Sequence, residues 1–393
     1  MPGYNLNNVK TNNRYEIIQK IYQNVDINRN HITREMGLTN SAVTKIINSL
    51  INEKYISEKN YLSAIRNRRA RYLSICEGSF GVITLYFGRH GITAAIADIC
   101  GKIIYSRDYT ITYSMMDEVI LNEIVDETVK NVSGGLSCLG CIGVTPGIRS
   151  DGEAAGDTEA LQEKSQAPYF WDMQKLDAIL KDKYHIPLFT ENDSNIALLG
   201  EKWFGKGKNT DNFVLYNIGR GIGSSVCIQG KLLRGYHNSS IEIGHVTINF
   251  EGPDCDCGNR GCLELYTGMD NWEKKLEDIP KYAGQQNRLE ALFLNARQGD
   301  NESRRLFDQY ARMIAEGALI LATMFSPEKI IVTTNEADFF HLPPIIEIVK
   351  KEINTRTFST RRQKICVEDS DLRKTGYILG GIALVLEKQL FAA

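Results

Sequence analysis

The chain has 393 residues, more than a single domain usually holds, so we expect two or three folded units with ample apolar core. Hydrophobic residues make up 42% and charged residues 24% of the sequence, a globular composition that excludes a disulfide miniprotein, a collagen and a disordered chain. The apolar runs are too short to span a bilayer and the N-terminus is polar, so we expect a cytoplasmic protein without a membrane partner. The net charge of −2 hides a basic end, because residues 1–72 hold 12 Lys and Arg against 5 Asp and Glu. That local charge of +7 suggests a polyanionic partner.

The N-terminal region predicts three helices separated by a tight turn. Apolar residues recur at helical spacing over residues 14–25 and again over residues 40–54. Between these segments, Ile32–Met36 predicts a short helix that ends at Gly37, and Thr39 is a suitable N-cap for the following helix.

Two alternating segments, residues 55–58 and 70–75, then predict strands on either side of a basic loop. Together with the three helices they indicate a winged helix-turn-helix, although a helical oligomerisation domain with a solvated basic loop is the alternative. In a helix-turn-helix the second helix of the motif enters the major groove and its N-terminal side chains face the base edges. Here these residues are small or polar, namely Thr39, Asn40, Ser41, Thr44, Lys45 and Asn48. The arginines of the wing, which are expected to meet phosphates or the minor groove, are Arg66, Arg68 and Arg69.

Beyond this region the pattern changes to strands alternating with helices, which predicts an α/β fold in two similar lobes with a cleft between them. The predicted elements of the first lobe are strands at residues 82–87, 92–97, 102–110 and 139–144, with a helix at 118–129. The predicted elements of the second lobe are strands at 213–218, 224–228, 231–234 and 329–334, with helices from 270 to 324. Residues 149–166 are polar and irregular, which favours a loop or lid.

One histidine and three cysteines have the spacing of a metal site. His245, Cys255, Cys257 and Cys262 fall within eighteen residues, and the intervening Gly258 and Gly261 allow tight turns. One imidazole and three thiolates form a closed tetrahedral set for Zn²⁺, which leaves no position for an activated water. We therefore expect a structural zinc, with unmetallated cysteines in a turn as the alternative.

The other six cysteines are expected to be small buried residues in a reducing compartment. They are Cys76, Cys100, Cys138, Cys141, Cys227 and Cys366. Cys138 and Cys141 flank a strand, and a redox role for them is the less favoured interpretation.

With these motifs the sequence resembles the ROK family of repressors and sugar kinases over nearly its whole length, most closely the xylose-repressor-like and N-acetylglucosamine-repressor-like regulators. The zinc motif and Glu242–His245 are the most specific marks, and the other matching segments are Gly143–Gly147, Glu191–Asn195, Trp203–Gly207 and Gly219–Gly223. The resemblance implies an actin-like, two-lobed sugar-kinase fold in which the last helix returns to the first lobe.

The resemblance also implies a sugar site. Carried over to this sequence, the sugar-binding residues are Asn192, Asp193, Glu242, His245 and Glu264. Carboxylates and an amide suit the alternating donors and acceptors of a sugar, and a zinc-bound His245 keeps one ring nitrogen for a hydroxyl. Taken singly, Asp193 has the alternative of a turn or cap carboxylate, and Glu242 and Glu264 that of solvated side chains.

The three phosphate-binding turns of the family's kinases are altered here. The first appears as Tyr86–His90 without its Asp, one Gly and its Thr. The second carries Arg220 between Gly219 and Gly221, and the third, Thr333–Asn335, has no glycine. Phosphoryl transfer needs backbone amides presented by such turns, so we expect no enzyme activity.

We therefore expect a sugar-responsive repressor that binds double-stranded operator DNA as a dimer, or as a dimer of dimers. Its expected domains are a winged helix-turn-helix at residues 1–75, a first lobe at 76–190 joined by the C-terminal helix at 375–393, and a second lobe at 191–374 that carries the zinc motif and the dimerisation helices. A sugar kinase fused to a DNA-binding head, and a regulator that answers to a sugar-transport protein, are the alternatives. The sequence names neither the sugar, for which xylose is a guess, nor the direction of its effect.

Overall fold

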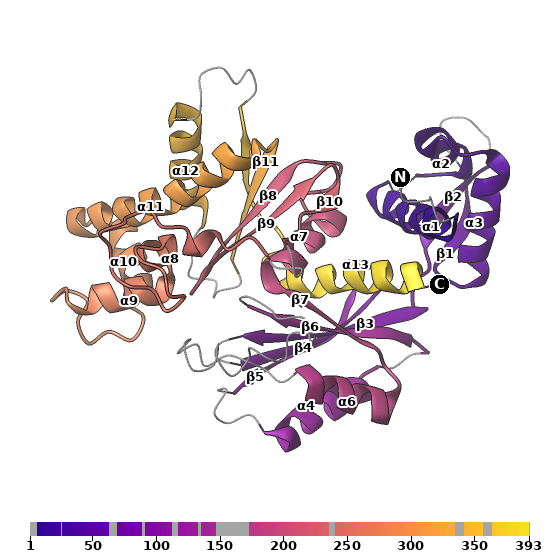
Figure 1. Cartoon of the computed structure of the whole chain (residues 1–393), viewed down its shortest axis with the longest axis horizontal. Helices are drawn as coiled ribbons and strands as arrows, with labels where there is room; N and C mark the ends of the chain where they lie inside the picture. The colour runs from indigo at the N-terminus through magenta and orange to yellow at the C-terminus, as the bar shows by residue number, and fades with distance from the viewer. Residues whose placement is uncertain are drawn as a thin grey trace. The chain divides into compact units, whose positions relative to one another are not determined.

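The computed structural model describes residues 6–24, 26–62, 69–88, 91–111, 117–132, 135–146, 173–235, 240–334, 342–356 and 364–392 (Figure 1). The described residues form two compact units. The first unit draws on Met1–Thr145, Trp171–Glu191 and Tyr377–Ala393, and the second draws on Pro146–Phe170 and Asn192–Gly376. Among the described helices, none has the length and apolar character needed to cross a membrane.

The N-terminal head has the order predicted for a winged helix-turn-helix. Its elements are α1 (Leu6–Gln23), α2 (Arg29–Met36), α3 (Asn40–Asn52), β1 (Ile56–Leu62) and β2 (Arg69–Ile75). Gly37 ends α2 with φ 63°, and the Thr39 hydroxyl accepts a hydrogen bond from the amide of Ala42, so both predicted helix signals are confirmed. The helices bury their apolar stripes against one another, and β1 pairs with β2 in antiparallel register.

The first unit also contains a five-stranded mixed sheet in the order β5-β4-β3-β6-β7. Its strands are β3 (Phe80–Gly88), β4 (Gly91–Asp98), β5 (Ile103–Thr110), β6 (Ser137–Thr145) and β7 (Leu188–Asn192). Its helices are α4 (Glu118–Lys130), α6 (Met173–Tyr184) and the C-terminal α13 (Lys374–Ala392). Helices α4 and α6 lie on one side of this sheet and α13 lies on the other (Figure 1). Because strand side chains alternate, Ile83 and Leu85 pack with α4 and α6, whereas Thr84 faces α13 at Gly381. The return of the last helix to this sheet, implied by the resemblance, is therefore observed.

The second unit is built on another five-stranded sheet, in the order β10-β9-β8-β11-β12. Its strands are β8 (Phe213–Ile218), β9 (Ile222–Ile228), β10 (Lys231–Leu232), β11 (Lys329–Thr333) and β12 (Cys366–Asp369). Helix α7 (Asp193–Phe204) covers one face, and α11 (Asn301–Phe325) and α12 (Leu342–Arg356) cover the other. Tyr216 on β8 shows the packing of the second face, because its hydroxyl donates to the carbonyl of Ile314 in α11 at 3.2 Å.

Short elements connect this sheet to its outer helices. They are η3 (Ile243–His245), α8 (Leu263–Thr267), α9 (Met269–Glu277) and α10 (Arg288–Arg297). The first two of them carry residues that the sequence assigns to a metal and to a sugar.

Candidate functional site

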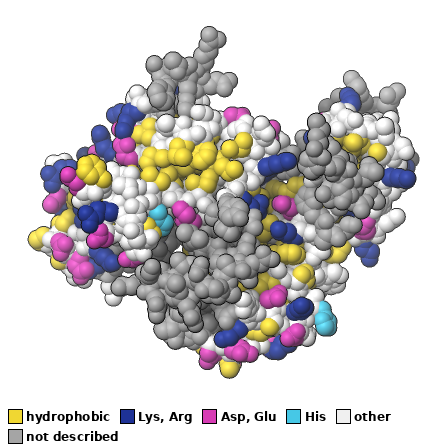
Figure 2. Space-filling view, in the orientation of Figure 1, with side chains coloured by type: hydrophobic (Ala, Val, Ile, Leu, Met, Phe, Trp, Pro, Cys, Tyr) yellow, Lys and Arg dark blue, Asp and Glu magenta, His cyan; other side chains and the backbone are white. Residues whose placement is uncertain are grey.

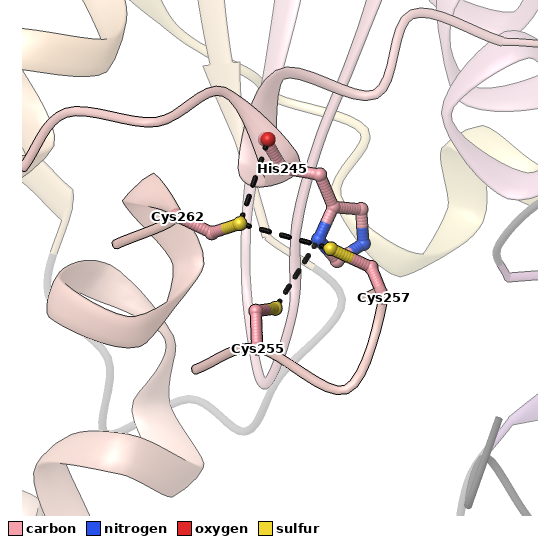
Figure 3. Close-up of side chains that lie close together, drawn as sticks. All are labelled: His245, Cys255, Cys257 and Cys262. Carbon is pink, nitrogen blue, oxygen red and sulfur yellow. Dashed lines mark hydrogen bonds between the residues drawn. The ribbon is translucent and has the colours of Figure 1, made fainter. Parts of the chain in front are cut away.

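The loop between η3 and α8 brings the four predicted metal ligands together (Figure 3). His245 lies in η3, Cys255 and Cys257 lie in the loop, and Cys262 immediately precedes α8. Gly261 is needed for this path, because its φ is 60° and a Cβ there would lie 1.6 Å from the carbonyl oxygen of Asn249. The glycine thus lets the chain fold back so that Cys262 meets the other three ligands.

The distances within this cluster suit a tetrahedral metal ion. Cys255 Sγ lies 3.7 Å from Nδ1 of His245, and Cys257 Sγ lies 3.7 Å from Sγ of Cys262. Zinc–sulfur and zinc–nitrogen bond lengths imply ligand separations of about 3.6 to 3.8 Å in a tetrahedron. All four ligand atoms lie within 4.8 Å of one another, so the residues present fit a metal ion and the predicted cluster is confirmed as a place that could hold one.

The thiols of this cluster hold their protons strongly when no cation is present. Burial and the neighbouring sulfurs raise the pKa of Cys262 to about 12, and burial also raises the pKa of Cys255. A bound cation supplies the positive charge that three thiolates need, and binding releases their protons.

Two predicted sugar residues lie at the start of α7. The side chain of Asn192 is the N-cap and accepts hydrogen bonds from the amides of Ser194 at 2.9 Å and Asn195 at 3.3 Å. Asp193 is buried in the first turn, and its carboxylate accepts from the amide of Ser194 at 2.6 Å. The cap role that the sequence left open for Asp193 therefore belongs to Asn192.

Backbone hydrogen bonds beside the His/Cys cluster hold Glu264, a further predicted sugar residue, close to η3. The amide of Leu263 donates to the carbonyl of Val246 at 2.9 Å and draws α8 onto the end of η3. Glu264, in α8, accepts a hydrogen bond from the amide of Ile222 at 2.8 Å. A Cβ on Gly244 would lie 3.2 Å from Glu264 Oε2, so this carboxylate lies beside the chain segment that leads to His245.

The remaining carboxylate, Glu242, precedes η3 and is half-buried. It accepts a hydrogen bond from Ser240 at 2.6 Å. Asn192, Asp193, Glu242, His245 and Glu264 all belong to the second unit. One unit thus contains every sugar residue that the sequence proposes, and Asn192 stands at its boundary as the last residue of β7.

The turn between β8 and β9 is held by an internal hydrogen bond and by an ion pair. The amide of Gly219 donates to the carbonyl of Gly221 at 3.0 Å. The guanidinium of Arg220 donates to the Asp270 carboxylate at 2.7 Å, a partner that sequence reasoning did not identify. At the end of β11, Thr333 and the following Thr334 are buried, while Asn335 lies outside the described residues, as do Arg89 and His90 of the first turn.

Helix α3, the second helix of the helix-turn-helix and its proposed recognition helix, has one buried face and one polar, exposed face. Val43, Ile46, Ile47 and Leu50 are buried in the head. All six residues proposed to face DNA bases are exposed, namely Thr39, Asn40, Ser41, Thr44, Lys45 and Asn48. In Figure 2 dark blue Lys and Arg side chains are visible on the described surface of the head. Helix α3 is therefore amphipathic, and its exposed polar face has the character expected for contact with the major groove of DNA.

The wing is described only in its strands. Arg66 and Arg68 lie outside the described residues, and Arg69 begins β2 with a side chain that is not described. Glu58 on β1 accepts a hydrogen bond from Arg29 of α2 at 3.0 Å, and Arg71 on β2 lies 3.9 Å from the same carboxylate. The first ion pair attaches β1 to α2, and the second joins the two wing strands to each other.

Comparisons with known proteins agree with this arrangement. The model described as the ROK family matches residues 82–388. The xylose repressor of Caldicellulosiruptor bescii is 26% identical over 393 residues, covering 97% of this chain and 97% of its own. The N-acetylglucosamine repressor of Escherichia coli O157:H7 is 26% identical over 400 residues, covering 98% of this chain and 95% of its own.

Solved structures show the same fold. A ROK family transcriptional regulator described as a homologue of the Escherichia coli MLC protein superimposes with a TM-score of 0.78 at 22% identity, covering 98% of both chains. A ROK family glucokinase from Streptomyces griseus, in complex with glucose and AMPPNP, has a TM-score of 0.63 at 22% identity and covers 77% of this chain and 98% of its own. The predicted fold class, a winged helix-turn-helix followed by an actin-like α/β domain, is confirmed.

Proposed function

The chain belongs to the ROK family, and from this membership we propose that it is a sugar-responsive transcriptional repressor. The observation that carries the proposal is the exposed polar face of α3, presented by a head that precedes the part of the chain matched by the family model. Similarity over nearly the full length to proteins named as repressors supports it. The protein acts on DNA in the cytoplasm, and two heads of a dimer, or four of a tetramer, place recognition helices in neighbouring major grooves.

The effector is a monosaccharide or a sugar derivative bound by Asn192, Asp193, Glu242, His245 and Glu264. Zn²⁺ held by His245, Cys255, Cys257 and Cys262 has a structural role, since four protein ligands leave no open position. Nδ1 of His245 faces the sulfurs, so the metal fixes the ring and leaves Nε2 for a hydroxyl group. A sugar that prefers one conformation shifts the spacing of the two heads, and a coupling of a few kcal/mol is sufficient.

We infer further that the chain does not transfer phosphate. The ion pair between Arg220 and Asp270 supports this inference. The guanidinium lies at the turn where a kinase presents a small hydroxyl, and it is bound to a carboxylate there. The amide of Gly219 is also bonded within its own turn rather than free for a phosphate oxygen. Asp193, the expected general base of a kinase, serves here as a hydrogen-bond acceptor for the sugar.

The experiment that tests the proposal is selection of genomic fragments of the host by the purified protein at one stated salt concentration, repeated with single sugars and with ATP. We expect a few palindromic sites, whose enrichment changes with one sugar and without ATP. Consumption of ATP in the presence of a sugar would instead establish the kinase. Specific enrichment that no sugar alters would point to a sugar-transport protein as the signal, and the absence of enrichment would overturn the repressor.

A further inference from the structure

Strand β9 lies between the two groups of sugar residues and contacts both of them. It pairs with β8 on one side and with β10 on the other. Consecutive side chains of a strand point to opposite faces of the sheet. Ser224 and Ser225 are fully buried neighbours in β9, so their hydroxyl groups reach opposite faces.

Ser225 contacts the helix that carries Asn192 and Asp193. Its hydroxyl donates to Oδ1 of Asn195 in α7 at 2.7 Å, and the side chain of Asn195 is fully buried as well. The first turn of the helix rests directly on the strand, because a Cβ on Gly223 would lie 2.2 Å from Oγ of Ser194. The first turn of α7, which carries Asp193, is therefore held against this face of β9.

Ser224 contacts the segment that carries Glu242 and His245, which lies beside β9 at the edge that also pairs with β10. Its hydroxyl donates to the carbonyl of Ile241 at 3.1 Å, and the two residues also form an antiparallel bridge. The start of the same strand holds Glu264 through the amide of Ile222. All three carboxylates of the proposed sugar site are thus attached to one strand within four residues.

We propose that Ser224 and Ser225 are positioning residues that set the distance between Asp193, in the helix packed on one face of β9, and Glu242 with Glu264, whose segments are bonded to Ser224 and Ile222. The inference rests on the proposed function, because it assigns these serines a part in sugar binding. A sugar binds to several groups at once, so a small displacement of one carboxylate weakens the contacts of the others. Neither serine needs to touch the sugar.

The test compares Ser224→Ala, Ser225→Ala and the parent chain by hydrogen–deuterium exchange without ligand. In Ser225→Ala we expect exchange about fivefold faster for the amides of Ser194 and Asn195, with those of η3 unchanged, because one buried hydrogen bond is lost on one face only. In Ser224→Ala we expect the reverse pattern, with faster exchange at Ile243 and His245 alone. If each hydroxyl only stabilised the strand as a whole, both variants would show faster hydrogen exchange in both segments. That result would overturn the proposal.

Sugar affinity is then measured by calorimetry with D-xylose, D-glucose and N-acetyl-D-glucosamine as probes. Each serine variant is expected to bind the probe that the parent binds about fivefold more weakly. Ser303→Ala is the matched control, since Ser303 is a buried serine of the same unit whose hydroxyl bonds to Tyr282, Asp300 and Lys281. It should lose stability while keeping the affinity and the exchange pattern of both segments.

The outcomes separate this inference from the function on which it rests. If the parent binds a probe and both variants bind it equally well, the positioning role is wrong and the repressor proposal stands. If the parent binds none of the probes and its operator binding answers to none, the sugar site itself is wrong and the role of the serines falls with it.

Discussion

The hydroxyl group of Tyr22 in α1 donates a hydrogen bond to the backbone carbonyl of Ile99, at the turn that follows β4. Burial raises the pKa of Tyr22 well above its usual value, so the hydroxyl remains a donor over the working pH range. The ring of Tyr55 in the head also contacts the ring of Phe80 at the start of β3, with centroids 4.9 Å apart. The head is thereby attached to the sheet of the first unit through two specific contacts.

We expect Tyr22→Phe to weaken this attachment. The change leaves the carbonyl of Ile99 without its donor and should cost about 1 kcal/mol of stability. Without sugar, the variant should bind operator as tightly as the parent does. The change in affinity that sugar causes should be smaller, because a movement of the sheet is transmitted less completely to the head. Fluorescence anisotropy with operator DNA measures both quantities. Tyr184→Phe, which removes a hydroxyl that donates to Asp126, is the control, and an unaltered sugar effect in Tyr22→Phe would make the contact purely structural.

Asn40→Ala should weaken specific operator binding without destabilising the head. Asn40 is exposed at the first position of α3, and alanine favours the helix more than asparagine does. If the amide reads a base edge, its loss costs about 1 to 3 kcal/mol against the operator and little against random DNA. Competition binding with both DNAs measures the difference, and an equal loss on both would contradict base readout at this position.

Lys45→Ala should behave differently from Asn40→Ala. A lysine that contacts phosphate contributes to binding of any sequence, so we expect weaker binding to operator and random DNA alike. The slope of log affinity against log salt should fall by about 1. Lys130→Ala, which removes the same charge from the exposed end of α4, should leave that slope unchanged.

Asp193→Ala and Glu242→Ala should abolish the sugar response and preserve operator binding. Both side chains are acceptors on the second unit, whereas the proposed DNA contacts lie in the head. The Asp193 change also removes a carboxylate from the N-terminus of α7, which costs about 0.3 to 1 kcal/mol of stability. Titration of the operator complex with the effective sugar measures the response. A sugar response retained in both variants would remove the proposed pocket.

Much of the fold was predictable because periodic apolar patterns and turn residues signal local structure. The predicted strand at residues 213–218 is β8 itself, and the caps at Gly37 and Thr39 fall where the sequence placed them. Helix α7 carried no such signal, because its residues from Asp193 to Trp203 are buried on every side and no apolar stripe exists. Strand β12 has only four residues, of which two are acidic. It forms because it pairs with β11 in the folded sheet, and no local pattern signals that pairing.

In the candidate site, too, the parts encoded in one short segment were predictable, whereas contacts between distant residues were not. The metal cluster was predictable because ligand types, spacing and glycines all lie within one short segment. The hydrogen bond from Ser225 to Asn195 was not, because it joins residues thirty positions apart and neither residue type is distinctive. Arg220 was recognised as unusual in its turn, but its partner Asp270 lies fifty positions away and becomes visible only in the fold.

Cys257→Ser should lower the zinc content of the purified protein below that of the parent. The loss of one of three thiolates weakens a metal site whose binding is coupled to folding of its loop. We expect a lower melting temperature and faster hydrogen exchange in residues 246–262, which lie between η3 and α8. Elemental analysis measures the metal. Cys366→Ser, at an exposed cysteine of β12, is the control, and equal zinc in all three proteins would refute the assignment.

The ion pair between Arg14 and Glu53 should make the stability of the head depend on pH. Arg14 in α1 donates to Glu53, just beyond α3, at 3.1 Å and to Ser49 at 2.9 Å. The hydrogen bond from Arg14 holds the pKa of Glu53 below its usual value. A lowered folded-state pKa means that the stabilisation is fully present above the unfolded-state pKa, about 4.3, and is lost as pH falls through the folded-state pKa.

Glu53→Gln should therefore destabilise the head at pH 7 by about 1 kcal/mol or less, as expected for a half-exposed ion pair. The difference from the parent should shrink as pH falls below the unfolded-state pKa and vanish below the lowered folded-state pKa. Hydrogen exchange of the α3 amides against urea measures the difference at each pH. Glu16→Gln, at an exposed glutamate of α1, is the matched control. A difference between Glu53→Gln and the parent that persists undiminished into acid would show that the glutamate stabilises the helix pair by packing rather than by its charge.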